Sequence, residues 1–174
     1  ERKPGEPVKR RLEWHRDGQY YHYLTKWMQA LNRASCATGD RRYNRWAIEL
    51  ARTAHDRFTY QSSPEGQKRM FWKMSIDLSY PLVSSMGQHD PLDGLITYEE
   101  LQAVAPKDAA WPTLSDEIDD ARRMCRGRPW KTADALGIGG LLGDAYRVAQ
   151  LVVHEDLEQS ALLEQLLEAS AQSL

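Results

Sequence analysis

The sequence predicts an all-α protein built from three consecutive antiparallel helical hairpins. Apolar residues recur at three- and four-residue steps in six segments, which is the spacing of one face of an α-helix. No segment alternates between apolar and polar residues for long enough to predict a ladder of paired strands. The chain has 174 residues, enough for one domain with a sizeable hydrophobic core.

The first hairpin follows a polar lead-in. Residues 1–18 are interrupted by proline and glycine, so we expect them to be extended and to precede a helical domain over residues 19–174. Helices are expected over residues 19–38 and 40–58, because Gly39–Asp40 combines a helix-ending glycine with a helix-capping aspartate. The residues expected to face inward are Tyr20, Tyr23, Leu24, Trp27, Met28, Leu31, Ala34, Tyr43, Trp46, Ala47, Leu50, Ala51, Ala54 and Phe58.

Four further helices complete the second and third hairpins. They are expected from Pro91 to residue 105, from the cap Thr113 to about residue 127, from residue 136 to 153 and from the cap Asp156 onwards. On the third helix the residues expected to face inward are Leu92, Leu95, Ile96 and Leu101. Gly94 would mark the close approach of a ligand or another backbone, and the glycines of the fifth helix favour close helix packing.

The segments that connect the helices differ in a regular way. The first, third and fifth helices are entered through long or glycine-rich loops that carry aromatic and charged residues. The second, fourth and sixth helices follow short polar turns or capped loops. This asymmetry predicts an inner and an outer layer of helices, with a functional site on the rim where the long loops gather.

Composition narrows the classes of function. The formal net charge of −2 argues against a general nucleic-acid binder, which would carry a basic excess. Six Trp and eight Tyr stand against two Phe, and such amphipathic rings suit a sugar or ligand cleft. The sequence has no apolar run of the ~20 residues that a membrane span needs. We therefore expect neither a nucleic-acid partner nor a membrane partner.

Cysteine usage and the first residues bear on the cellular setting. Cys36 and Cys125 fall in helical patterns, so we expect two buried thiols, which fits a reducing compartment. No signal-peptide pattern is present, so a cytoplasmic location is expected. The chain opens on Glu1 rather than Met, which indicates that an upstream segment is missing.

Two stretches of the chain resemble a known superfamily. Residues 21–31 with the turn at 37–43 resemble a hairpin of the six-hairpin (α/α)6 toroids, and residues 72–77 with 85–95 fit a second hairpin. That superfamily includes glycoside hydrolases and N-acylglucosamine 2-epimerase-like isomerases. The resemblance implies a carbohydrate ligand. A complete toroid has six hairpins, so this partial toroid implies that the remainder of a longer chain or a second copy completes the ring.

The polar residues near the predicted helix starts supply candidate chemistry. Glycoside hydrolysis needs a carboxylic acid and a carboxylate, whereas epimerisation needs a base, usually His, beside a carbonyl. The candidate catalytic residues are His22, Asp77, His89, Asp90 and Asp93. The candidate substrate-binding residues are Trp14, Tyr21, Trp72, Lys73, Gln88 and Trp130. The alternative for Asp90 and Asp93 is a purely structural role in capping the third helix.

A second class of function stays open. A non-catalytic α-helical scaffold that binds a ligand or a protein fits the absence of a strong catalytic motif. No His-x-x-x-His pair is present, so we expect no metal site, and no other cofactor is expected.

Overall fold

Helices make up most of the described chain, as the apolar spacing predicted. The structure is a computed structural model that describes residues 5–7, 9, 12, 14–61, 63, 66–153 and 157–174. The chain divides into two compact units, Glu1–Met124 and Cys125–Leu174. The helices of the described part are α2 (Tyr21–Thr38), α3 (Arg42–Phe58), α4 (Asp90–Val104), α5 (Ser115–Cys125), α6 (Ala135–Val152) and α7 (Leu157–Ser173).

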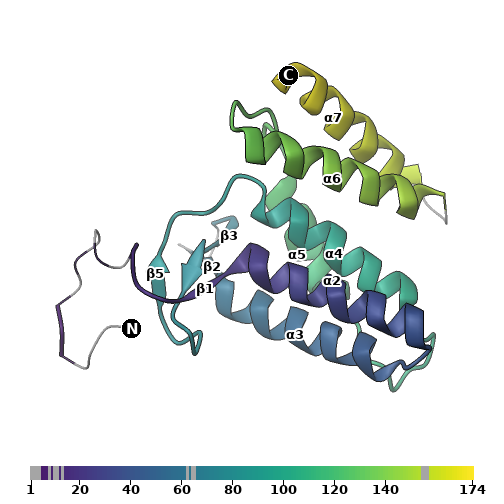
Figure 1. Ribbon diagram of the computed structural model, residues 1–174, viewed down its shortest axis with the longest axis horizontal. Coiled ribbons are helices and arrows are strands. Elements are labelled where there is room, and N and C mark those ends of the chain that lie inside the picture. The colour runs from purple at the N-terminus through teal and green to yellow at the C-terminus, as the bar shows by residue number, and fades with distance from the viewer. Residues whose placement is uncertain are drawn as a thin grey trace. The chain divides into compact units, whose positions relative to one another are not determined.

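The turn between α2 and α3 has the predicted conformation. Gly39 is left-handed, with φ of 72°, and its N–H donates to the carbonyl of Ser35 at 2.9 Å. Asp40 accepts a hydrogen bond from the N–H of Arg42 at 3.0 Å. This confirms the first antiparallel hairpin, with α2 and α3 side by side (Figure 1).

The buried face of α2 is rotated from the predicted one. Tyr23 and Trp27, both expected inside, are 56% and 65% exposed, and Trp46 of α3 is 49% exposed. Leu24 and Met28 are buried as expected. The other buried residues of α2 are Tyr21, Thr25, Asn32 and Ser35. Because three of these four are polar, a prediction based on apolarity selected the neighbouring stripe.

Helix α4 is the most deeply buried helix of the first unit. Every residue from Asp90 to Tyr98 is buried. The residues predicted to face inward, Leu92, Leu95, Ile96 and Leu101, are at most 4% exposed. The helix begins one residue earlier than predicted, because His89 occupies the cap position. The carboxylate of Asp90 turns back instead to the N–H of Gly87, at 3.2 Å.

The predicted difference between inner and outer helices is found only in part. Ten of the 15 residues of α4 are buried, against six of 18 in α2 and seven of 17 in α3. Greater burial is therefore seen for the third predicted helix but not for the first. Helix α5 is tied to both of its neighbours, through Arg122 with Glu99 of α4 at 2.9 Å and Asp120 with His55 of α3 at 3.3 Å.

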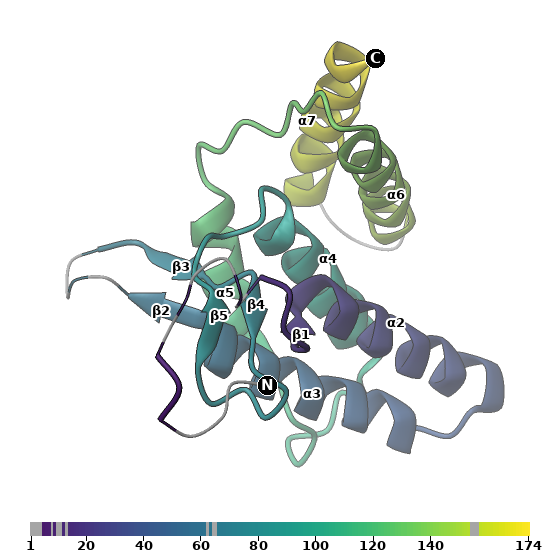
Figure 2. The ribbon, with the colours of Figure 1, turned by 60° about the vertical axis from the view of Figure 1, so that its left-hand side comes forward.

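Two small antiparallel sheets contradict the expectation of no strand ladder. β4 (Lys73–Met74) pairs with β1 (Gln19–Tyr20) and with β5 (Pro81–Val83). β2 (Thr59–Gln61) pairs with β3 (Lys68–Met70) (Figure 2). Strands of two or three residues are too short to show an alternating pattern. The three-stranded sheet lies immediately before α2 and α4 in the chain and holds the segments that lead into them.

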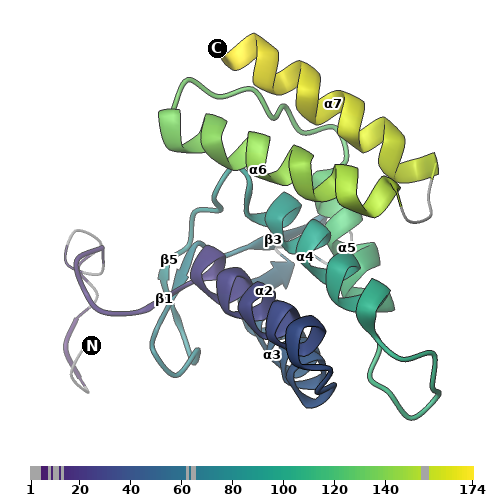
Figure 3. The same ribbon diagram turned by 45° about the vertical axis from the view of Figure 1, so that its right-hand side comes forward.

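The second unit is a hairpin of α6 and α7, which lie side by side (Figure 3). Asp134 caps α6 by accepting the N–H of Gly137 at 2.7 Å, and the N–H of Thr132 donates to Ser173 at 3.2 Å, which joins the start of the unit to its end. Three of the four glycines of α6 do not serve close packing as expected, because Cβ atoms at Gly139, Gly140 and Gly143 would meet open space, whereas a Cβ at Gly137 would lie 2.8 Å from Cγ2 of Thr132. Asp156, the predicted cap of α7, lies outside the described residues.

Candidate functional site

The candidate site begins with the register of α2 and α4. Several hydrogen bonds link the helices, and three of them join residues that are 68 positions apart in the sequence. These bonds join Thr25 to Asp93, Gln29 to Thr97, and Asn32 to the carbonyl of Glu100. A constant separation requires the two helices to run in the same direction. Their N-terminal ends therefore lie at the same end of the unit (Figure 1).

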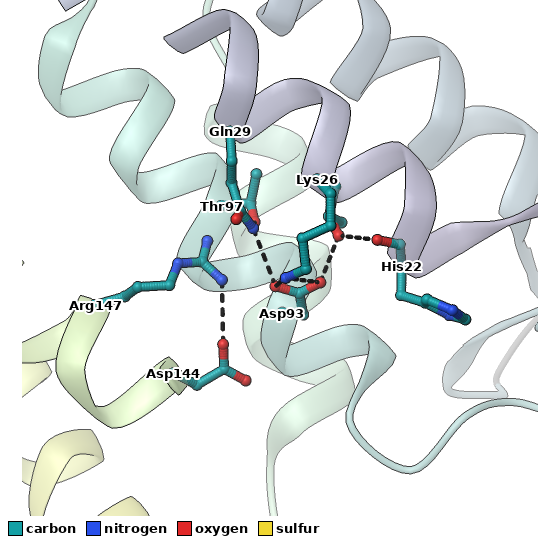
Figure 4. A network of polar contacts seen from close by, with 8 residues as sticks. His22, Lys26, Gln29, Asp93, Thr97, Asp144 and Arg147 are labelled. Carbon is teal, nitrogen blue, oxygen red and sulfur yellow. Dashed lines mark hydrogen bonds and ion pairs between the residues drawn. The ribbon is translucent and has the colours of Figure 1, made fainter. Parts of the chain in front are cut away.

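Asp93 is the centre of this contact. Its Oδ2 lies 2.5 Å from the hydroxyl of Thr25, and its Oδ1 lies 3.3 Å from Nζ of Lys26 and 3.4 Å from Nε2 of Gln29. Figure 4 shows Lys26 and Gln29 directed at the carboxylate. The side chain of Lys26 is 58% exposed, whereas Asp93 is 8% exposed. The hydroxyl of Thr25 also lies 2.9 Å from the carbonyl of His22, and its single hydrogen is shared between these two oxygens. The two nitrogen donors, of which Lys26 is charged, favour the ionised form of the Asp93 carboxyl group.

Asp90 lies one turn earlier on α4 in a different environment. It is 7% exposed, and the N–H of Gly87 is the donor to its Oδ2. Burial, and next the nearby charge of Asp93, raise the pKa of Asp90 to about 7. Two neighbouring carboxyl groups thus lie in different surroundings. Asp90 holds a proton up to near-neutral pH, whereas Asp93 is surrounded by donors.

His22 lies in the first turn of α2, beside these carboxyl groups. Its imidazole extends away from Asp93 in Figure 4. The ring contacts Tyr20 and Tyr23, with centroids 5.6 Å and 4.5 Å apart. Burial lowers the pKa of His22, and the charge of Asp93 partly offsets this effect. The imidazole of His22 therefore packs against an aromatic cluster.

The aromatic cluster comprises Trp14, Tyr20, Tyr23 and Trp72. The centroids of Trp14 and Trp72 are 4.7 Å apart, and those of Tyr20 and Trp72 are 5.3 Å apart. Trp14 is 49% exposed and Tyr23 is 56% exposed, so two residues of the cluster face solvent over about half of their surface. Exposed indole and phenol rings give an apolar wall with polar edges.

Two residues expected to bind substrate are instead inside the unit. Tyr21 is fully buried, and its hydroxyl lies 2.6 Å from that of Tyr98. Burial raises the pKa of both phenols, so both are neutral. Lys73 is 2% exposed, and its ammonium group donates to the carbonyls of Trp14 and Arg16. The sequence could not show which of Tyr20, Tyr21 and Tyr23 faces α4.

The remaining candidate residues of the first unit are Asp77, which lies in a separate turn, and Gln88 and His89, which directly precede Asp90. Asp77 is exposed and organises its own turn, because its Oδ1 accepts from the hydroxyls of Ser75 and Ser79 and from the N–H of Ser79. The Ser75 bond is the main cause of the lowered pKa of Asp77. Gln88 is exposed, and His89 directly precedes Asp90 as the helix cap.

Trp130, the last candidate substrate-binding residue, belongs to the second unit and is 6% exposed. That unit has its own polar pair, in which Arg147 donates to Asp144 at 3.1 Å (Figure 4). Both residues are on α6, three positions apart.

Four polar residues of this contact were not predicted, namely three that bond to Asp93 and a fourth, Thr97, that bonds to Gln29. Thr25, Lys26 and Gln29 lie on α2, and Thr97 lies on α4. A signal was present: polar residues recur at positions 25, 29 and 32 of one helix and 93 and 97 of the other. Polar stripes at helical spacing on two helices indicate faces that can hydrogen-bond to each other.

Comparison of the chain with protein-family models, curated proteins and solved structures finds no match. Within the described ranges, no group of three or more His, Cys, Asp or Glu side chains is arranged to hold a metal ion. None of the helices in the described part is both long and apolar enough to cross a membrane. Cys36 is exposed and Cys125 is partly exposed, so the expectation of two buried thiols is wrong.

Proposed function

We propose that the protein is a carbohydrate-active enzyme of the six-hairpin (α/α)6 toroid type that hydrolyses a glycosidic bond beside the first turns of α2 and α4. The observation that carries the proposal is the contrast between Asp90 and Asp93. Burial keeps Asp90 protonated up to near-neutral pH, while Oδ1 of Asp93 accepts from the ammonium group of Lys26 and the amide of Gln29, contacts that suit a carboxylate. Glycoside hydrolysis needs one carboxyl group in each state.

The reaction assigns one step to each carboxyl group. Asp90 gives its proton to the glycosidic oxygen as the bond from that oxygen to the anomeric carbon breaks. Asp93 removes a proton from the water that attacks the anomeric carbon. The products are two sugars with free hydroxyl groups, and a proton returns to Asp90 for the next cycle. The aromatic cluster supplies a wall against which the apolar face of a sugar ring packs.

The parallel register of α2 and α4 supports the toroid part of the proposal. Inner helices of such a ring run in the same direction, and their first turns gather at one rim. The register brings the first turns of α2 and α4 together in this way. Further hairpins from the remainder of a longer chain, or from a second copy, would complete the ring.

A second reaction is favoured by one specific observation. Burial lowers the pKa of His22, so its imidazole is neutral and able to accept a proton at neutral pH. Sugar epimerisation uses such a base to remove a proton from the carbon beside a carbonyl group. A ketose or N-acyl sugar in place of a glycoside would then be the substrate of the same site.

The proposal is tested with the 174-residue chain and a panel of aryl glycosides whose released phenol is fluorescent. Asp90→Asn and Asp93→Asn are each expected to lower kcat by about 10²–10⁴-fold and to leave the protein folded. Asp56→Asn is the matched control, because the side chain of Asp56 is 77% exposed on α3. Equal turnover in the three variants would refute the assignment of the two carboxyl groups.

Two further outcomes separate the alternatives. If aryl glycosides are not cleaved but an N-acyl sugar exchanges a proton with deuterated water, and His22→Gln abolishes the exchange, the epimerase reaction is correct. If sugars bind without turnover, the protein is a non-catalytic scaffold. If no sugar binds, the carbohydrate proposal fails as a whole.

A further inference from the structure

Lys73 combines deep burial with a positive charge. It belongs to the central strand of the three-stranded sheet and is 2% exposed. Burial removes the hydrogen bonds that an ammonium group makes to water, so a buried ammonium group is stable only where protein groups replace them. Here the partners are the main-chain carbonyls of Trp14, at 3.1 Å, and Arg16. The ammonium group also lies 4.9 Å from the ring centroid of Tyr20.

Both carbonyls belong to one short segment, residues 14–18, which we term the strap. A main-chain carbonyl can be held only if the backbone follows a fixed path, so the two bonds fix the path of the strap over β4. A purely apolar residue at position 73 would fill the same space without fixing it. The ammonium group of Lys73 therefore positions the strap and does not bind a ligand.

The strap lies directly against the sheet. A Cβ atom on Gly18 would overlap the carbonyl oxygen of Met74 and the side chain of Leu82, so only glycine allows this approach. Arg16 is also anchored, because its guanidinium group pairs with Glu6 at 2.7 Å. The strap is therefore held at two points. Gly18 packs against the sheet at one end, and the ammonium group of Lys73 binds carbonyls nearer the other end.

The outer end of the strap carries Trp14, one of two half-exposed rings of the aromatic cluster. The Trp14 ring packs against Trp72, and the carbonyl of the same residue accepts from Lys73. We propose that Lys73 is a positioning residue that holds the strap in place, so that Trp14 completes the aromatic wall against which the sugar ring stacks. This inference rests on the proposed carbohydrate function and adds the residue that builds its binding wall.

The first test measures the strap without any ligand. Hydrogen exchange is followed in the full chain and in Lys73→Met, with Lys107→Met as the matched control on an exposed loop. Lys73→Met should lose protection in residues 14–18, whereas the amides shared by α2 and α4 should keep theirs. In Lys73→Ala, added n-propylammonium should restore the protection, because it replaces the missing atoms and the charge, and 1-propanol should not restore it. An unchanged strap in Lys73→Met would overturn the inference.

The second test measures the site. With the most reactive aryl glycoside of the panel, Lys73→Met should raise KM about tenfold and change kcat by less than about twofold, because a stacking contact is lost while the carboxyl groups remain. Trp14→Ala should raise KM equally but keep the strap protected. A freed strap with an unchanged KM would show that Trp14 is not part of the wall, and the inference would then be wrong.

A second variant keeps the inference testable if Lys73→Met does not fold. Gly18→Ala retains the buried charge but pushes the strap away from Met74 and Leu82, so it should reproduce the loss of protection and the rise in KM. If the wild-type chain acts on no sugar and binds none, the carbohydrate proposal fails and Trp14 loses its role. Hydrogen exchange and n-propylammonium rescue then still decide whether Lys73 holds the strap.

Discussion

A methyl group on Gly94 would overlap the hydroxyl oxygen of Tyr21 and would stand 3.2 Å from the Cζ atom of its ring. A glycine inside a helix ordinarily weakens it by about 1 kcal/mol relative to alanine. At this position the missing side chain makes room for a buried phenol between α2 and α4. The sequence suggested a ligand or a backbone at Gly94, and the group that approaches is a side chain.

Gly94→Ala is therefore expected to destabilise the protein by roughly 1–3 kcal/mol, because the surroundings of Tyr21 are buried and cannot move aside freely. Urea unfolding would measure this loss. The loss should be smaller in a Tyr21→Phe background, where the overlapping oxygen is absent. Gly143→Ala in α6 is the control, since a Cβ there meets open space, and it should stabilise its helix by up to about 1 kcal/mol. Equal effects of both alanines would contradict the packing described.

The pKa of Asp90 predicts an unusual dependence of stability on pH. The folded protein keeps the Asp90 proton up to about pH 7, whereas the unfolded chain releases it near the ordinary value of 3.8. The folded state binds more protons between these values, so the free energy of unfolding should fall as the pH rises through this window. Asp90→Asn should remove roughly 2–4 kcal/mol of this fall.

Urea melts at pH 4, 5.5 and 7 would measure the effect. Asp56→Asn serves as the control and should leave the slope unchanged, because its side chain is 77% exposed. Parallel pH profiles for wild type and Asp90→Asn would show that Asp90 is ionised in the folded protein throughout the window.

The turn at Gly39 allows a test of conformation alone. Its φ of 72° favours glycine, and a Cβ there would meet nothing within 4 Å. Gly39→Ala should therefore cost about 1 kcal/mol through backbone strain, and Gly39→Asn should cost less, because asparagine tolerates the left-handed region. A thermal melt that does not separate the two variants would count against this explanation.

Asn44 is a buried amide that joins several elements. It is 1% exposed, its Nδ2 donates to Asn32 Oδ1 and to the carbonyl of Leu101, both at 3.0 Å, and its Oδ1 accepts from Trp111 at 3.2 Å. Asn44→Asp removes both donors and buries a charge, so we expect a loss of about 3–5 kcal/mol. Asn44→Ala, without the charge, should cost less. The reverse order in equilibrium unfolding would refute this account of the site.

The sequence predicted where the helices lie along the chain better than it predicted which side of each helix is buried. The hairpin of α2 and α3 was predicted from Gly39–Asp40, because a left-handed glycine and an adjacent aspartate are local features. The buried side of α2 was not, because Thr25, Asn32 and Ser35 become inward only through partners on other segments. The pairing of the short strands was not predicted, because strands of two or three residues carry no alternating pattern, and β1 and β4 are also far apart in the sequence.

The same contrast applies to the candidate site: the positions of its residues in the helices were predicted, and the contacts of their side chains were not. His22, Asp90 and Asp93 were selected as polar residues near predicted helix starts, and all three lie in the first turns of α2 and α4. Tyr21 and Lys73 were selected too, but their polar groups serve Tyr98 and the strap. Whether a polar side chain faces a ligand or the protein depends on its neighbours in space, which spacing along the chain does not give.

Three hydrogen bonds between α2 and α4 share the same separation of 68 residues. This shared separation limits where residues can be inserted into or deleted from the chain. One residue inserted into α2 between Thr25 and Gln29 would turn one bonded side chain by about 100° relative to the other and shift it by 1.5 Å along the axis. The bond of Thr25 to Asp93 and the bond of Gln29 to Thr97 could then not form at the same time. In related sequences, insertions and deletions should therefore be absent from the interiors of these two helices. They should occur instead in the segments between them, such as the turn that leads from β4 to β5.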